Sequence, residues 1–564
     1  MRRFTEPSVA DAAHRRVAEA SAARGRAREG SAEILLAAVS LIVLADAINS
    51  ALASVTRPYL MGGLSVSADG VAQIGVMYFI CKLLGFLFAD HARNRWGDRT
   101  ALLGCGTLLA ITDIAAGLLH SYPVFLVSQS IQGAAGGVAI AVGQAALLKS
   151  FALQRQPLVQ AVFALAAVVI PAMLIPAFLG LTAEGIGWPW VVMSAAGLAG
   201  CGTMLLPGAR ISLGGRSKSA PFITARTLCL VVAVSCGVFV LQRGERYDWF
   251  GSLGIAECLT ACSAALAIFI VLESGASRGS FRYHPFRLAD FSFGTFVGIV
   301  AGIALFGSNA VIALIPADVL GYPISQAGLL LAPSALCAIP VMFGVAWCIA
   351  RMRVPMFAFV GVGLVLFASA MWLTAALPPG VSFGALALRI SLRGLAIGGL
   401  FLPLALLTLL PVPPRDTCAA CGFFNFARQL GGLIGIAWIQ TLAHRLDAGA
   451  STVLIGHLSA GNPHLSSYLA QAREAIAAGG SAVAQGAGAL VMAVQAFDRQ
   501  TLALAADGCC QAVSLFFAVA VPIVIIVRIL TSRLLAARAA DTPEGSGEPE
   551  VSVESQTLST GEPE

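Results

Sequence analysis

The chain has 564 residues, of which 58% are hydrophobic and only 11% are charged, and its mean hydropathy is +0.84. Soluble domains contain about 25% charged residues, so water cannot solvate most of this surface. The net charge is +6, with 35 Lys and Arg against 29 Asp and Glu. This composition excludes an ordinary soluble domain and indicates a membrane protein.

Long apolar segments recur along the whole chain. A helix that crosses the hydrocarbon core needs about 20 apolar residues. These segments are continuous runs, whereas a membrane β-barrel has short alternating ones. The fold class predicted is an all-α integral membrane protein with fourteen spans, at 33–53, 71–89, 101–120, 124–147, 158–180, 189–207, 224–242, 252–272, 292–314, 325–348, 355–375, 384–410, 419–442 and 509–531.

The distribution of positive charges predicts the orientation. With the N-terminus inside, 25 of the 35 Lys and Arg lie on the cytoplasmic side and six on the opposite side. Because cytoplasmic loops carry the excess of Lys and Arg, both termini are expected in the cytoplasm of a bacterial inner membrane protein. The net charge then reports orientation and gives no indication of nucleic-acid binding. The last residues are rich in Glu, Pro, Gly and Ser and are expected to be disordered.

Several kinds of chemistry have no motif in this chain. None of the three lysines follows a glycine, so the phosphate loop of an ATPase is missing. The seven histidines show no metal-ligand spacing, and Cys418 and Cys421 begin an apolar segment without a second pair. We therefore expect no cofactor, no metal and no enzymatic activity. The remaining possible functions are transport driven by a gradient and passive facilitation.

The first span contains two polar residues, Asp46 and Asn49, in an otherwise apolar run. A carboxylate near the centre of a bilayer costs about 2.5–3.5 kcal/mol on insertion scales, and such residues usually line a transport path. Three residues along a helix turn by about 300°, so the two side chains point within about 60° of each other. This pair is the first candidate for coupling transport to protons.

Further motifs follow in chain order. Residues 49–58 end in a proline nine positions after Asn49, residues 94–99 read NRWGDR, and residues 129–133 read QSIQG. Prolines stand at 171 and 176, and residues 425–435 read NFARQLGGLIG. In this order the motifs resemble those of the major facilitator superfamily, in particular its fourteen-span drug:proton antiporters of the EmrB/QacA type. The resemblance covers residues 33–532.

The resemblance implies two six-helix bundles, formed by spans 1–6 and 9–14, with spans 7 and 8 as an inserted pair. The expected division is a basic cytoplasmic N-tail at 1–32, an N-terminal bundle at 33–207, an insert with cytoplasmic loops at 208–291, a C-terminal bundle at 292–532 and a disordered tail at 533–564. Antiporters similar to this chain carry an external insertion like 443–508 and can work with a periplasmic adaptor (membrane fusion) protein.

The resemblance also implies roles for residues of these motifs. Asn49 stands at the family's aspartate position and Gln129 at its arginine position, while Gln132 is retained; these three, with Asp46, are expected to serve proton coupling. Arg95, Gly97 and Arg99 match the gating loop, for which an ordinary positively charged loop is the alternative. Pro171, Pro176 and Gly180 match the fifth-span motif, which kinks a helix whatever its function. Asn425 and Arg428 belong to the thirteenth-span signature.

Four other charged residues lie in apolar context. Asp113 is either a functional acid or an interfacial one near the outer end of its span, and Lys82 either serves the site or extends to the interface. Arg389 and Arg393 share one helix face because they are four residues apart. The glycines after Arg393 echo those after Gln132, which predicts that Arg393 supplies the cation missing at Gln129.

Three functions fit these features. The leading hypothesis is a secondary active transporter that exports small amphipathic or aromatic compounds, as in multidrug efflux, by proton antiport. The second is a dedicated exporter of an endogenous, possibly anionic, metabolite. The third is a membrane sensor or scaffold that no longer transports. The sequence names neither the substrate nor the stoichiometry.

Overall fold

A computed structural model of the chain describes residues 9–209, 224–275, 282–352, 354–375, 381–457, 466–467, 469–471 and 482–540. All regular elements in these ranges are helical. Parts of the expected segments 208–291 and 443–508, and the tail from 541 onward, lie outside the described residues.

The N-terminal half, defined here as α1 to α9, contains the first six predicted spans. The fifth span is built from four consecutive helical pieces, α6 to α8 with η2 between α6 and α7, while the other spans are single helices. The elements are α1 (Val9–Val55), α2 (Arg57–Leu64), α3 (Ala68–Trp96), α4 (Asp98–Leu119), α5 (Tyr122–Ser150), η1 (Leu153–Arg155), α6 (Gln156–Ala164), η2 (Leu165–Val169), α7 (Ile170–Met173), α8 (Ile175–Gly185), α9 (Trp188–Leu205) and η3 (Leu206–Gly208).

The predicted inserted pair is present as α10 (Ala225–Arg243) and α11 (Leu253–Ser274), which pack against each other. The short helices η4 (Glu245–Tyr247) and η5 (Trp249–Gly251) join them. Thr224 begins α10 with a reciprocal pair of hydrogen bonds to Thr227, the arrangement of a capping box. A small apolar cluster of Leu87, Leu230 and Phe269 fixes the pair against α3.

The C-terminal half, defined here as α12 to α20, follows a short helix η6 (His284–Arg287). Its first span is interrupted by one π-helical turn, η7, and followed by another, η8. In other proteins such turns frequently mark functional sites. The elements are α12 (Ala289–Gly302), η7 (Ile303–Gly307), α13 (Ser308–Leu314), η8 (Ile315–Val319), α14 (Ile324–Leu329), α15 (Ala332–Met352), α16 (Met356–Ala375), α17 (Phe383–Leu409), α18 (Thr417–His457) and α20 (Ala482–Ala540).

Thirteen helices of the described chain are long and apolar enough to cross a membrane. They correspond to all the predicted spans except 419–442, which lies within α18. The polar residues Asn425, Arg428 and Gln429 of α18 are buried inside the molecule. These polar residues lower the mean hydropathy of the segment, although their side chains face the protein and not the lipid.

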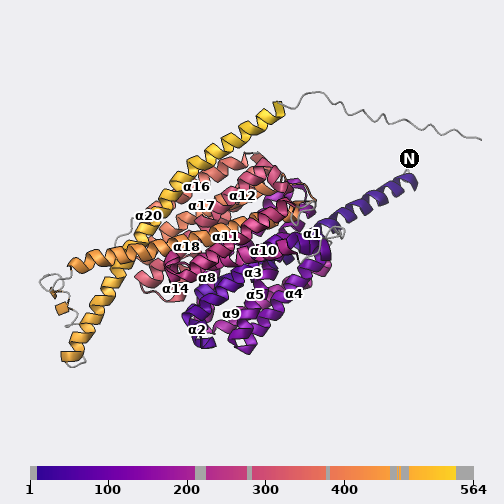
Figure 1. The fold of residues 1–564 in the computed structure, drawn as a ribbon. Coiled ribbons are helices and arrows are strands. Elements are labelled where there is room, and N and C mark those ends of the chain that lie inside the picture. Colours follow the sequence, from indigo (N-terminus) through magenta and orange to yellow (C-terminus); the bar gives the residue numbers. More distant parts are fainter. Residues whose placement is uncertain are drawn as a thin grey trace, which may run out of the picture.

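The helices α1, α18 and α20 extend beyond the helical body (Figure 1). α18 has 41 residues and α20 has 59, which at 1.5 Å per residue corresponds to about 60 and 90 Å. A bilayer with its headgroups is only about 40–45 Å thick, so both helices project from it. The described parts of the expected external segment, 443–457 and 482–508, thus continue the flanking helices. The start of the expected disordered segment 533–564 is likewise helical, because α20 runs to Ala540.

The two halves contact each other along a few helices. α18 packs against α3 and α5, while α8 packs against α14, and α6 packs against α15 and α17. Gly422 of α18 lies so close to the Phe86 carbonyl oxygen of α3 that a Cβ would overlap it. Since α3 and α5 also carry buried polar residues of the N-terminal half, these contacts connect its interior to the other half.

Candidate functional site

Asp46 of α1 is 1% exposed and lies in a compact polar cluster with α3. Its Oδ2 pairs with Lys82 Nζ at 2.7 Å, and its Oδ1 accepts a hydrogen bond from the Tyr78 hydroxyl at 2.7 Å. Lys82 Nζ also donates to the Tyr78 hydroxyl at 3.1 Å. Lys82 is therefore buried and paired with an acid, so it does not extend to the membrane interface.

Space for the Asp46 carboxylate comes from a glycine of α5. A Cβ at Gly136 would overlap Asp46 Oδ1, and a Cβ at Gly133 would overlap the Tyr78 carbonyl oxygen. Small residues let membrane helices approach closely, and the GAAGG sequence of α5 does this along α1 and α3. The small residues noted after Gln132 thus position the acid cluster.

Asp113 of α4 is fully buried and accepts hydrogen bonds from two carboxamides. Gln132 Nε2 donates to Oδ1 at 2.8 Å, and Asn49 Nδ2 donates to Oδ2 at 3.3 Å. No cation among the described residues forms an ion pair with Asp113. The buried carbonyl oxygens Asn49 Oδ1 and Gln132 Oε1 have no hydrogen-bond partner, so either amide can turn to accept a bond from a protonated Asp113.

The side chains of Asp46 and Asn49 therefore belong to two different clusters, although they lie one turn apart. Asp46 faces the cation of α3, while Asn49 faces the acid of α4. Gln129 is 1% exposed, and neither end of its amide has a hydrogen-bond partner. It lies outside both of these networks as the structure has them.

The two arginines of α17 lie in different surroundings. Arg393 is 1% exposed and donates from Nη1 to the Ser308 hydroxyl at 2.8 Å, while its Nε and Nη2 have no partner. Arg389 is half-buried and donates to the Leu373 carbonyl oxygen at 2.9 Å. Arg393 is thus an interior cation of the C-terminal half, in line with its depth along the span.

A small cavity lies between the two halves. Gln144 and Gln160 line it from α5 and α6, Asn425 and Arg428 from α18, and Phe163 and Phe424 are among its apolar residues. Asn425 Nδ2 donates to Gln144 Oε1 at 2.8 Å, and Arg428 Nη2 donates to Asn425 Oδ1 at 3.0 Å. Its volume of about 20 Å³ holds a water molecule and no larger ligand.

The fifth-span motif forms the contact between halves at one end of this cavity. Pro171 and Pro176 stand in the first turns of α7 and α8, where a missing N–H is tolerated, and the span breaks at Leu174. Gly180 lies against α14, where a Cβ would be 2.8 Å from Ser325 Cα. Glu184 accepts a hydrogen bond from the Ser325 N–H at 3.0 Å.

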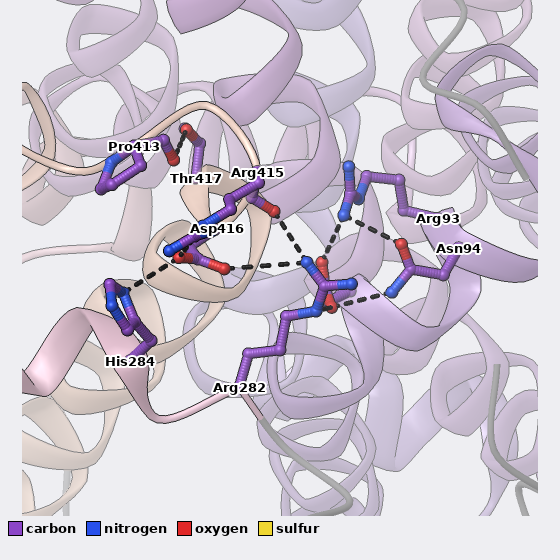
Figure 2. Close-up of polar contacts among 9 residues, drawn as sticks. Arg93, Asn94, Arg282, His284, Pro413, Arg415, Asp416 and Thr417 are labelled. Atoms are coloured by element: carbon purple, nitrogen blue, oxygen red, sulfur yellow. Dashed lines mark hydrogen bonds and ion pairs between the residues drawn. The ribbon is translucent and has the colours of Figure 1, made fainter. Parts of the chain in front are cut away.

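The contact at the opposite end is an ionic cluster, named here the Asp90 cluster (Figure 2). Asp90 of α3 pairs with Arg93 at 2.8 Å and lies 3.7 Å from Arg282, which precedes α12. Arg282 lies 3.7 Å from Asp416, just before α18, and Asp416 also contacts His284 at 3.1 Å. The cluster therefore joins the end of α3 to the start of α18.

Arg95, Gly97 and Arg99, which match the expected gating loop, take little part in the contact between the halves in this structure. Arg95 is exposed, Gly97 adopts φ +85 between α3 and α4, and Arg99 donates to the Pro207 carbonyl oxygen at 3.1 Å. That carbonyl lies near the C-terminal end of α9, as expected for an arginine at a helix C-terminus, but within the same half. Asn94 does join the cluster, because it donates to Asp90 and accepts from Arg93.

Burial around the Asp90 cluster affects a neighbouring phenol. Tyr283 stacks on Phe423 of α18 with ring centroids 5.8 Å apart. Burial, with the charge of Glu273, raises the pKa of Tyr283 above its usual value, so the phenol stays neutral. The phenol therefore adds no charge to the cluster.

Sequence reasoning missed several residues of these clusters. Tyr78 gave no signal because tyrosine in an apolar helix is common, although its place one turn before Lys82 puts both on one face. Asp90 lies one turn before Asn94, so the motif could have been extended backward. Arg282 and Asp416 become recognisable only when α3 and α18 are brought together. No group of three or more potential metal ligands occurs among the residues described.

Comparisons with known proteins agree with this architecture. The family described as the Major Facilitator Superfamily matches residues 39–436. The multidrug export protein EmrB of Haemophilus influenzae is 24% identical over 450 residues, which cover 78% of this chain and 87% of that protein. EmrB of Escherichia coli K12 is 22% identical over 441 residues, covering 78% and 85%.

A solved structure supports the fold. The crystal structure of the human organic anion transporter MFSD10 aligns with a TM-score of 0.51 and 14% sequence identity, covering 87% of this chain and 99% of that one. At this identity the likeness concerns the fold alone. Because the family match extends over residues 39–436, more than half of the chain, this protein belongs to the major facilitator superfamily.

Proposed function

We propose that this chain exports small amphipathic or aromatic compounds by proton antiport, through alternating access to the cavity between its halves. The observation that carries the proposal is the pair of buried acids in the N-terminal half. Asp46 is bonded to α3 and Asp113 to α5, and both of these helices pack against α18 of the other half. A proton that binds either acid therefore changes bonds on a helix of the interface.

The two acids respond differently to a proton. Protonation of Asp46 removes the charge that pairs with Lys82, so α1 and α3 lose an ion pair in the interior. Protonation of Asp113 requires one of its carboxamide partners to turn, because a carboxylic acid must donate its hydrogen to an acceptor. Either event gives the two access states different stabilities, which is what coupling requires.

Alternating access needs contacts that close each end in turn. At one end α8 lies against α14 beside Gly180, and at the other the Asp90 cluster joins α3 to α18. Between them the cavity is too small for a drug-sized ligand, because pockets that hold such ligands have volumes of about 300–1,000 Å³. This conformation corresponds to an occluded state, from which either end opens.

The proposal includes the placement in the membrane. The positive charges put the Asp90 cluster and both termini in the cytoplasm, with the bundles at 33–207 and 292–532 and the insert at 208–291. α18 and α20 then project on the outer side. Their length supports contact with a periplasmic adaptor protein.

Inside-out membrane vesicles test the proposal. An imposed pH gradient, acidic inside, should drive uptake of at least one fluorescent amphipathic probe, with ethidium and dansylglycine tried in parallel. Asp46→Asn and Asp113→Asn should each reduce gradient-driven uptake at unchanged expression, and the exposed Glu257→Gln should not. Gradient-driven uptake that survives in both acid variants would contradict proton coupling at these residues.

A further inference from the structure

The C-terminal half contains two buried arginines whose charge is not matched. Arg393 is 1% exposed and Arg428 is 6% exposed, and neither forms an ion pair with an acid among the described residues. The buried cation of the N-terminal half, Lys82, has Asp46 as its partner. The interior positive charge without a partner is therefore confined to one half.

Of these two arginines, Arg428 lines the cavity between the halves. The one hydrogen bond found for its guanidinium in the described chain goes from Nη2 to Asn425 Oδ1, a neutral amide on the same helix. Arg393 instead donates to Ser308 within its own half and does not line the cavity. Arg428 is thus the cation that a bound compound can reach.

The charge of Arg428 is costly where it lies. Taking an ion out of water costs several kcal/mol even after relaxation, and a neutral amide does not offset this as an anion would. A guanidinium binds carboxylate, sulfonate or phosphate oxygens through a planar pair of N–H donors. The cavity supplies further amide donors from Gln144, Gln160 and Asn425, and apolar surface from Phe163 and Phe424.

We propose that Arg428 binds an acidic group of the transported compound, so that the substrates are amphipathic anions. Once an end has opened and the cavity has widened, the acidic group lies between the Arg428 guanidinium and the Asn425 amide, and the apolar part lies on Phe163 and Phe424. This inference rests on the proposed transport function, since it names the class of compound carried.

Binding of an anion at this place has a mechanical consequence. Asn425 Nδ2 now donates to Gln144 Oε1, and this bond links α18 to α5 across the two halves. An acidic group that accepts from Asn425 Nδ2 competes with Gln144 for the donor. The compound therefore loosens a link between the halves as it binds, which favours the rearrangement needed for its release.

The test compares two probes that differ only in charge. Dansylglycine carries a carboxylate, and dansylglycinamide is its neutral counterpart. The purified full chain in nanodiscs of neutral phosphatidylcholine is dialysed against each probe without a pH gradient, and binding to empty discs is subtracted. The wild type should bind dansylglycine about 10- to 100-fold more tightly, the effect of one hydrogen-bonded ion pair.

Variants assign this preference to Arg428. Arg428→Gln should bind both probes equally, whereas Arg428→Lys, which keeps the charge, should retain part of the preference. Arg351→Gln is the matched control, because it removes the same charge from an exposed position at the end of α15. If Arg428→Gln does not fold, Asn425→Ala provides the test and should weaken binding of dansylglycine alone.

Two results would overturn the inference: equal binding of both probes by the wild type, or an unchanged preference in Arg428→Gln. Because the measurement uses no gradient, its outcome is independent of proton coupling. A protein that prefers the anionic probe but shows no gradient-driven uptake in vesicles would refute the transport mechanism and leave the binding site standing.

Discussion

Asp46 and Asp113 lie on neighbouring helices of the N-terminal half, yet their partners give them different chemistry. Asp46 is held by a cation and a phenol, Lys82 and Tyr78. Asp113 is held only by two carboxamides that can reverse their orientation. A single buried acid in an apolar helix is a functional candidate, and two with different partners allow a proton to be bound and released at different steps.

Variants of the Asp46–Lys82 pair separate its contribution to stability from its role in transport. Lys82→Met leaves Asp46 buried without its cation and should reduce the free energy of unfolding by about 3–5 kcal/mol. Asp46→Leu combined with Lys82→Met removes both charges and should restore most of that stability. Thermal unfolding in detergent measures both, and uptake in vesicles should be lost in the double variant.

The control for this pair is Arg246→Met, which breaks an exposed pair with Asp69 and should leave the unfolding temperature nearly unchanged. A double variant that is stable and still couples uptake to the gradient would remove Asp46 from the mechanism. In that event Asp113 is the coupling acid.

At the scale of elements, the fifth span is the most irregular helix of the N-terminal half. Prolines at 171 and 176 and the π-helical turn η2 divide it into short pieces, and α8 then packs on α14. The first span of the C-terminal half contains the π-helical turn η7 and is followed by a second one, η8. Divided helices of this kind bend at defined points, so these two spans are the elements suited to open and close an end of the cavity.

Gly180 permits that closure, because any larger side chain meets the backbone of α14. Gly180→Leu should keep α8 and α14 apart, reduce transport at least tenfold and leave the protein folded. A cysteine introduced at Ser325 should become more reactive toward a water-soluble maleimide in this variant. Gly185→Leu, on the same helix but with open space around it, is the control and should behave like the wild type.

Normal maleimide reactivity at position 325 together with lost transport would mean that Gly180 acts in another way than by closing this end. Unchanged transport would show that α8 and α14 need not touch during the cycle.

At the scale of the whole molecule, the two halves are in contact at both ends, and only a small cavity lies between these two contacts. Within the Asp90 cluster, the two pairs that Arg282 forms with Asp90 and Asp416 are partly exposed and 3.7 Å long, so each contributes only about 0.2–1 kcal/mol. Such weak contacts hold one end closed without preventing it from opening. The helix–helix contact at the other end depends on shape rather than charge.

Loss of one charge from the Asp90 cluster should therefore shift the balance between states by a small amount. Asp416→Asn should increase the labelling rate of the buried Cys418 about 1.5- to 5-fold, because that end opens more often. Labelling of individual cysteines by maleimide, resolved by mass spectrometry, measures the change. High salt should raise the wild-type rate toward that of the variant, since salt screens exposed charges.

The exposed substitution Glu257→Gln changes the charge equally but lies in α11, away from the cluster, and should leave the rate unchanged. If Asp416→Asn labels no faster than the wild type at low salt, the cluster does not hold this end closed.

The sequence alone determined the class, the spans and the family of this protein. Each span is a local property, because about 20 consecutive apolar residues satisfy the bilayer wherever they stand in the chain. Thirteen of the fourteen predicted spans appear as apolar helices, and the motifs follow the order found in the superfamily. The one exception, 419–442, does not meet the hydropathy criterion because α18 carries polar residues, which it buries.

Only the tertiary structure decided which polar residues act together. Asp46 meets Lys82 at a separation of 36 positions, Asn49 meets Asp113 at 64, and Asn425 meets Gln144 at 281. Hydropathy indicates that such residues are buried. It does not indicate which face of a helix packs against which neighbouring helix. That choice depends on where glycines such as Gly136 and Gly180 let two helices approach, and hence on both helices at once.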